Sequence, residues 1–139
     1  MIVVYKFGKR FDGNLSPKEG VNLYWLHSQA HNGKVLFTTS KSPSPENRDL
    51  IDEIILTTAD GSIAVHAKVD SLSKYAIMNP PKEYLVPSPW ENEDTGKKVW
   101  FALSDVRKID GGIKPGDFTC VSGKDLLQSI SGNAYMVYC

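Results

Sequence analysis

Residues 52–69, DEIILTTADGSIAVHAKV, decide the fold class that we predict for this chain. Two runs rich in β-branched residues, 52–58 and 63–69, flank a turn centred on Asp60-Gly61. An Asp-Gly pair between two such runs is a strong signal for a β-hairpin. Apolar and polar side chains alternate along the second run, so we expect one face of the hairpin to be buried and the other to be largely polar.

More strands are predicted on both sides of the hairpin. Segments that favour strands lie at 2–7, 34–39, 97–103, 117–121 and 133–138, and a short helix is predicted at 125–130. These strands lack the regular β–α–β spacing of a parallel sheet. We therefore predict an α+β, mainly β fold: a small mixed or antiparallel barrel with one main helix and a short C-terminal helix, in a single domain over 1–139.

The main helix is predicted to begin at Ser16 and to end at Asn32-Gly33. Ser16 can cap the first turn, and Pro17 suits the first helical position. Glu19 completes a capping box with Ser16. Asn-Gly is a common helix stop because both residues tolerate a left-handed backbone.

This helix carries two apolar faces. At about 100° per residue, one face holds Val21, Tyr24, Trp25 and Ser28, and the nearly opposite face holds Leu23, Leu26 and Ala30. We expect one face to cover the sheet and the other to meet a terminus, a partner subunit or a ligand.

Two proline-containing segments are predicted to be irregular. Residues 41–49, KSPSPENRD, form an exposed loop that is either a lid beside a site or only a connection. Residues 72–95 are predicted to be a long connection. The turn-prone residues 8–14 should lead from the first strand into the helix.

Composition excludes some classes of function. The chain has 139 residues with 16 basic and 16 acidic side chains, which argues against coating nucleic acid through bulk positive charge. No run approaches the roughly 18 apolar residues of a membrane span, so we expect a cytoplasmic protein that does not enter membranes. Cys120 and Cys139 lack metal-ligand spacing, and we expect both to be reduced.

No catalytic, metal or cofactor motif is evident, so we predict no catalytic residue, no metal and no cofactor. His27 and His31 are four apart on the helix, but they fall on its polar side without a clear carboxylate or cysteine partner. His66 is expected to be solvated on the polar face of its strand. Trp25, Trp90 and Trp100 can form a stacking surface for a planar ligand, or can simply pack in the core.

Four stretches, LYWLHSQAHNGKVLFTTSK (23–41), GSIAVHAKV (61–69), SPW (88–90) and KKVWFALSDVRKI (97–109), together resemble the PUA-like domains, and within them the EVE and ASCH branches. The resemblance rests on the order of these elements and covers most of the chain. It implies a pseudo-barrel with a cleft between the first helix and the neighbouring strand ends. In such families the cleft accepts a nucleobase, often modified, in RNA or flipped from DNA.

The resemblance also implies which residues line the cleft. They are Tyr24, Trp25 and Ser28 on the helix, Thr39, Ser40 and Lys41 at the strand end, and Trp90. An aromatic ring would stack on the base, hydroxyls would contact its edge, and Lys41 would meet a phosphate.

We therefore expect a non-catalytic module that binds nucleic acid or a modified nucleotide. One alternative is an ASCH-like hydrolase acting on nucleosides or RNA, for which Thr39, Lys41 and Glu53 form the plausible catalytic set. Another is a protein-interaction module or homodimer that uses the second apolar face of the helix.

Overall fold

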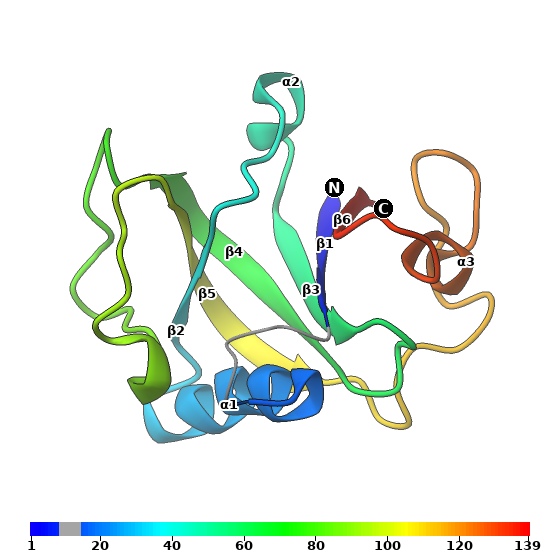
Figure 1. Cartoon of the computed structure of the whole chain (residues 1–139), viewed down its shortest axis with the longest axis horizontal. Helices are drawn as coiled ribbons and strands as arrows, with labels where there is room; N and C mark the ends of the chain where they lie inside the picture. The colour runs from blue at the N-terminus through cyan, green and yellow to red at the C-terminus, as the bar shows by residue number, and fades with distance from the viewer. Residues whose placement is uncertain (9–14) are drawn as a thin grey trace.

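The computed structural model describes residues 1–8 and 15–139 and has an α+β, mainly β fold (Figure 1). Its strands are β1 (Ile2–Phe7), β2 (Val35–Thr39), β3 (Glu53–Thr58), β4 (Ala64–Lys74), β5 (Val99–Lys108) and β6 (Met136–Tyr138). Its helices are α1 (Pro17–Ala30), α2 (Pro45–Arg48), α3 (Leu126–Ile130) and the 3-10 turn η1 (Ser88–Trp90). The predicted fold class is confirmed, whereas most of the connection predicted at 8–14 lies outside the described residues.

The strands form one six-stranded sheet in the order β2-β5-β4-β3-β1-β6, curled into a half-barrel (Figure 1). β1 and β3 are parallel, and the other neighbouring pairs are antiparallel, so the sheet is mixed, as predicted. β2 and β6 are its two edges. The segment that follows β2 reaches the other edge, because the backbone N–H of Ser44 donates to the hydroxyl of Tyr138 at 3.1 Å.

The predicted hairpin is present as β3 and β4, with Thr57 opposite Ala64. Gly61 adopts φ 72°, a left-handed conformation that glycine adopts without strain. The Asp60 carboxylate stabilises the turn because it accepts hydrogen bonds from the Thr58 hydroxyl at 2.7 Å and from the Ser62 backbone N–H at 3.0 Å. These bonds explain why the Asp-Gly signal could be recognised from local sequence.

This turn should make the fold sensitive to acid. Hydrogen bonds from Ser62 and Thr58 lower the pKa of Asp60 from 3.8 to about 2. A carboxylate whose pKa is lower in the folded state stabilises the fold above its unfolded pKa, and that contribution disappears as pH falls. We expect the free energy of unfolding to decrease between about pH 4 and pH 2, and Asp60→Asn to remove this part of the decrease. Urea unfolding across that range measures it, with Asp110→Asn as control; superimposable curves for wild type and Asp60→Asn would contradict it.

α1 begins and ends as predicted. The capping box between Ser16 and Glu19 is formed, and the backbone N–H of Gly33 donates to the carbonyl of Ser28 at 2.7 Å. The helix lies across one end of the half-barrel and contacts strands β1 to β5 (Figure 1). Although α1 is 14 residues long, neither it nor any other helix within 1–8 and 15–139 has the length and apolar character needed to cross a membrane.

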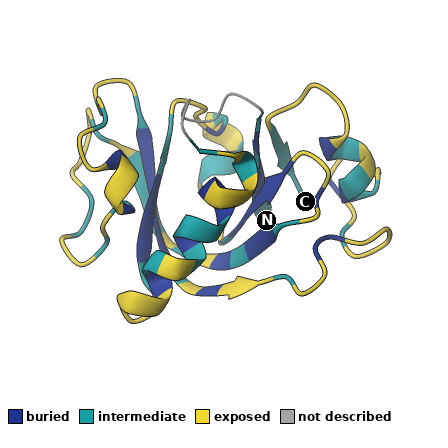
Figure 2. Ribbon diagram, turned by 60° about the horizontal axis from the view of Figure 1, so that its bottom comes forward, coloured by how far each residue is buried: buried dark blue, intermediate teal, exposed yellow. Residues whose placement is uncertain are grey.

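Buried residues concentrate on the strands and on the inner side of α1, whereas the connecting loops are largely exposed (Figure 2). The main core lies between α1 and the sheet and is rich in aromatic rings: Tyr5, Phe7, Tyr24, Phe37, Trp90 and Phe101. A second core lies between the other face of the sheet and α3, and a third, small cluster surrounds Trp100.

Some predicted boundaries were wrong. Residues 117–121 do not form a strand; only an isolated bridge joins Thr119 to Asp125. The loop predicted at 41–49 contains the short helix α2. β4 extends to Lys74 and β5 to Lys108, because these two strands pair over almost their whole lengths.

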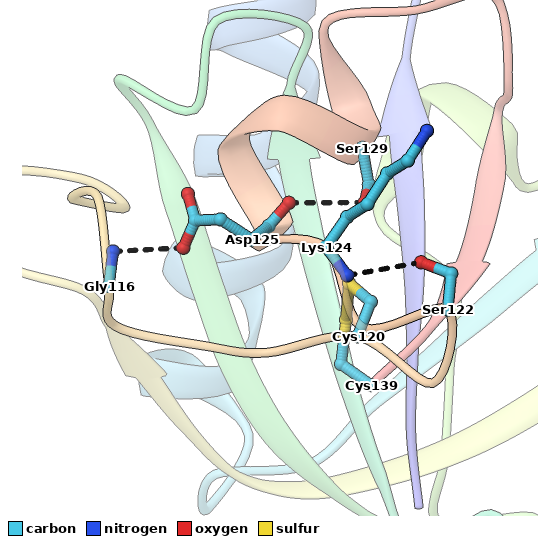
Figure 3. Close-up of a disulfide and its surroundings, with 7 residues drawn as sticks. All are labelled: Gly116, Cys120, Ser122, Lys124, Asp125, Ser129 and Cys139. Carbon is cyan, nitrogen blue, oxygen red and sulfur yellow. Dashed lines mark hydrogen bonds between the residues drawn. A yellow bond between two sulfur atoms is a disulfide. The ribbon is translucent and has the colours of Figure 1, made fainter.

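The prediction of two reduced cysteines was also wrong, because Cys120 and Cys139 form a disulfide (Figure 3). Pairing of the strands brings them together. The residue after β6, Cys139, exchanges backbone hydrogen bonds with Ile2 in β1, and the backbone N–H of Val121 donates to the carbonyl of Tyr138 at 2.9 Å. The disulfide therefore links the loop before α3 to the edge of the sheet.

Candidate functional site

Tyr24 and Trp90, two of the aromatic residues predicted to line the ligand site, are in contact with each other in the core. Their ring centroids are 5.1 Å apart and the planes are inclined by 15°, so the rings stack. Both are buried, with 2% and 7% of their surface exposed. Their faces are therefore occupied by protein, and a ligand would have to separate them in order to stack between them.

The other two helix residues, Trp25 and Ser28, make contacts of their own. Trp25 is half-buried, and the ammonium group of Lys108 lies 4.2 Å from its ring centroid, which is a cation–π contact. Ser28 is fully buried, and its hydroxyl donates to the carbonyl of Trp25 at 2.7 Å within the helix. Among the described residues, no hydrogen bond or ring contact joins either side chain to the strand-end residues.

Thr39, Ser40 and Lys41 lie where the chain leaves β2 and crosses toward β1 and β6. The hydroxyl of Tyr5 donates to the carbonyl of Lys41 at 2.7 Å, and the hydroxyl of Thr39 accepts from the backbone N–H of Lys41 at 3.1 Å. The Lys41 ammonium is exposed, 5.8 Å from the ring centroid of Tyr135. These three residues lie together where β2 ends.

A hollow of about 390 Å³ lies beside α1, at the side of the helix that faces the proline-containing connection. It is lined by His27 and His31 from α1 and by Leu85, Val86, Ser88 and Glu91 from the connection. Ligand sites commonly have volumes of roughly 300–1,000 Å³, with mainly apolar walls and a few polar groups. This hollow fits that description.

Two stacked imidazoles form the helix side of the hollow. The ring centroids of His27 and His31 are 3.9 Å apart with an interplanar angle of 7°. Nδ1 of His31 lies 2.8 Å from the carbonyl oxygen of His27, whereas Nε2 of His27 is shielded from solvent without a hydrogen-bond partner. Burial lowers the pKa of His27, and the neighbouring His31 lowers it further, which favours a neutral His27 at neutral pH.

The opposite wall is fixed by contacts of residues 85–93 with the rest of the fold. The backbone N–H of Leu36 in β2 donates to the carbonyl of Leu85 at 2.9 Å, and Trp90 is held by its stack on Tyr24. Beyond η1, Glu93 accepts a hydrogen bond from the hydroxyl of Thr38 at 3.2 Å. The chain therefore folds back over α1 through non-local contacts.

This hollow was not predicted from the sequence. The only local signal was the spacing of four between His27 and His31, which were predicted to lie on the polar side of the helix. Nothing in the sequence of residues 85–91 indicated that this segment would line a site beside the helix. Within 1–8 and 15–139, no three His, Cys, Asp or Glu side chains are grouped so as to hold a metal ion.

The residues of the alternative hydrolase set are not brought together. Thr39 lies opposite Val99 in β5, whereas Glu53 lies opposite Lys68, which pairs with Ser104 in β5. Val99 and Ser104 are therefore the positions on β5 level with Thr39 and Glu53, and they lie roughly 17 Å apart along the strand at about 3.4 Å per residue. Glu53 instead faces His66, with Oε1 at 2.9 Å from Nε2.

The second apolar face of α1 remains largely exposed. Leu26 has 54% of its surface exposed, Ala30 is exposed and Leu23 is half-buried against the main core. A protein partner or a second copy of the chain on this face therefore stays a prediction.

The fold and the hollow together define a small α+β half-barrel with a candidate ligand site between its main helix and a folded-back connection. No family model matches the chain, and no similar curated protein or solved structure was found.

Proposed function

We propose that this protein is a binding module for a small planar heterocycle of the nucleobase or nucleoside class, and that the hollow beside α1 is its site. The observation that carries the proposal is the pairing of a flat imidazole stack with apolar walls in a hollow of about 390 Å³. The volume is sufficient for a base with its sugar, and flat apolar surfaces favour planar ligands over flexible ones.

The polar groups of the hollow provide the means of recognition. Ser88 can donate or accept a hydrogen bond, and the carboxylate of Glu91 can accept from an amino or imino group on the edge of a base. The balanced net charge of the chain suits recognition of one base better than tracking along a phosphate backbone.

In this proposal Tyr24 and Trp90 support the site and do not stack on the ligand. Their stack fixes η1 and thereby the position of the wall that carries Ser88 and Glu91. Thr39, Ser40 and Lys41 remain candidates for contacts with a longer nucleic acid, although no described contact connects them to the hollow.

The test is a titration of the protein with nucleosides and modified nucleosides, observed through the imidazole NMR signals of His27 and His31. We expect saturable shifts of these signals for at least one ligand. His31→Ala should weaken binding of that ligand roughly 5- to 150-fold, because an aromatic stacking contact to a base contributes about 1–3 kcal/mol.

Gln29→Ala is the matched control, because Gln29 is exposed on the same helix and does not line the hollow. It should leave the affinity unchanged. Titrations that move neither histidine signal for any nucleoside would refute the proposed function, as would equal weakening by the two substitutions.

A further inference from the structure

A second, smaller depression of about 90 Å³ lies on the face of the sheet opposite α1. It is lined by polar side chains from three adjacent strands, with Ala67 at its base: Glu53 from β3, His66 and Lys68 from β4, and Asp105 and Arg107 from β5. Glu53 and His66 alternate with residues of the main core, so they face away from α1. The site is therefore separate from the hollow of the proposed function.

An irregularity in the strand pairing concentrates these groups. His66 lies opposite Arg107 and Lys68 lies opposite Ser104, so the register shifts between them. Asp105, within this bulge, adopts φ 51°, which is unusual for a residue other than glycine. Bulges of this kind redirect side chains and are frequent beside functional sites.

His66 is the most constrained member of the group. Its Nε2 atom lies 2.9 Å from Oε1 of Glu53, but without hydrogen-bond geometry, and it is shielded from solvent. The ring of Phe118 meets the imidazole edge to face at 5.9 Å. The imidazole is therefore held at a fixed position in the lining of the depression, where its ring signals can report a bound ligand.

The charges favour an anion over a cation. Lys68 has no ion-pair partner among the described residues, so its positive charge in the lining is not neutralised and would repel a cation. Glu53 and Asp105 oppose an anion, but each already faces a positive or protonatable partner, His66 and Arg107 respectively. The depression holds roughly three water molecules, which leaves room for a tetrahedral oxyanion and none for a base.

Arg107 can turn toward such a ligand at little cost. Its guanidinium donates to both oxygens of Asp105, at 3.1 and 2.7 Å, but its side chain is 74% exposed. Only Nε and Nη2 donate to Asp105, so the Nη1 edge of the guanidinium can donate to a ligand oxygen while Asp105 stays paired. Guanidinium groups match oxyanions because they donate two parallel hydrogen bonds.

We propose that this depression binds a phosphate group, with Arg107 and Lys68 as the cationic ligands. The ligand is inorganic phosphate or the phosphate of a monoester. This site does not depend on the proposed nucleoside site.

The test is an NMR titration of the protein with phosphate ligands. Inorganic phosphate and phenyl phosphate serve as the two probes, and the ring signals of His66 report binding. We expect saturable shifts with both if the site accepts monoesters, and with inorganic phosphate alone if it accepts only the free ion. Arg107→Ala should weaken binding roughly tenfold or more, because hydrogen bonds to charged groups are lost.

Lys97→Ala is the matched control, because this exposed lysine precedes β5 at the end remote from Arg107. It should leave binding unchanged, as should His31→Ala in the separate hollow. Arg107→Lys keeps the positive charge but removes the parallel N–H donors of the guanidinium, and it should give an intermediate affinity. The proposal is overturned if neither probe moves the His66 signals, or if Lys97→Ala weakens binding as much as Arg107→Ala.

Discussion

Replacement of Trp90 with alanine is expected to lower the free energy of unfolding by about 3–5 kcal/mol, the usual cost of removing a buried aromatic side chain. Trp90 is 7% exposed and stacks on Tyr24 with a centroid separation of 5.1 Å. The substitution removes that stack and leaves a cavity between α1 and the connection that carries η1. It should also loosen the wall of the hollow and weaken any nucleoside that binds there.

Urea unfolding measures the effect, with Trp90→Phe as the control that keeps an aromatic ring on Tyr24. The phenylalanine variant should recover more than half of the lost stability, because most of the apolar surface is restored. A loss below about 0.5 kcal/mol for Trp90→Ala, the usual range for surface substitutions, accompanied by abolished nucleoside binding, would show that Trp90 contacts the ligand and not the core.

The same residue shows how far sequence analysis could go. The Ser-Pro-Trp element at 88–90 indicated that Trp90 either packs or binds, because a tryptophan beside prolines is unfavourable when exposed. Its partner could not be deduced, because Tyr24 lies far away in sequence and the two meet only after the connection folds back over α1. The histidines of the hollow were overlooked for the same reason.

Local signals succeeded where local interactions determine the structure. The capping box of Ser16 and Glu19 and the turn at Asp60-Gly61 are formed by residues within a few positions of each other, and both were predicted. The strand predicted at 117–121 failed because a strand requires a partner. Phe118 and Cys120 alternate as in a strand and pack on the α3 side of the sheet, but this segment has only one isolated bridge, to Asp125.

The disulfide was missed because the spacing of cysteines does not give their separation in space. Cys120 lies in an irregular segment, and Cys139 follows β6, which pairs with β1 at the edge of the sheet. The pair is adjacent only because the segment before α3 hydrogen-bonds to the end of β6. Figure 3 shows the disulfide beside the start of α3, where the Asp125 carboxylate accepts a hydrogen bond from the backbone N–H of Gly116 at 2.8 Å.

Loss of the disulfide is expected to lower the free energy of unfolding by about 3 kcal/mol, the value that chain entropy predicts for a loop of this length. The cysteines are 19 residues apart, so the bond restricts the unfolded chain over the segment that contains α3 and β6. β6 is short and half-buried, and it pairs only with β1. Hydrogen exchange should therefore accelerate first in residues 136–139 and in the β1 amides that pair with them.

Urea unfolding of the wild type with and without a dithiol reductant measures this contribution, and Cys139→Ser provides the matched variant without the bond. The reduced wild type and the oxidant-treated variant should unfold at similar urea concentrations, and the reductant should not affect the variant. Because Cys120 is 5% exposed, its thiol remains packed in the α3-side core, so the fold should persist at lower stability. An unfolding midpoint of the wild type that is the same with and without the reductant would show that the bond does not stabilise this edge of the sheet.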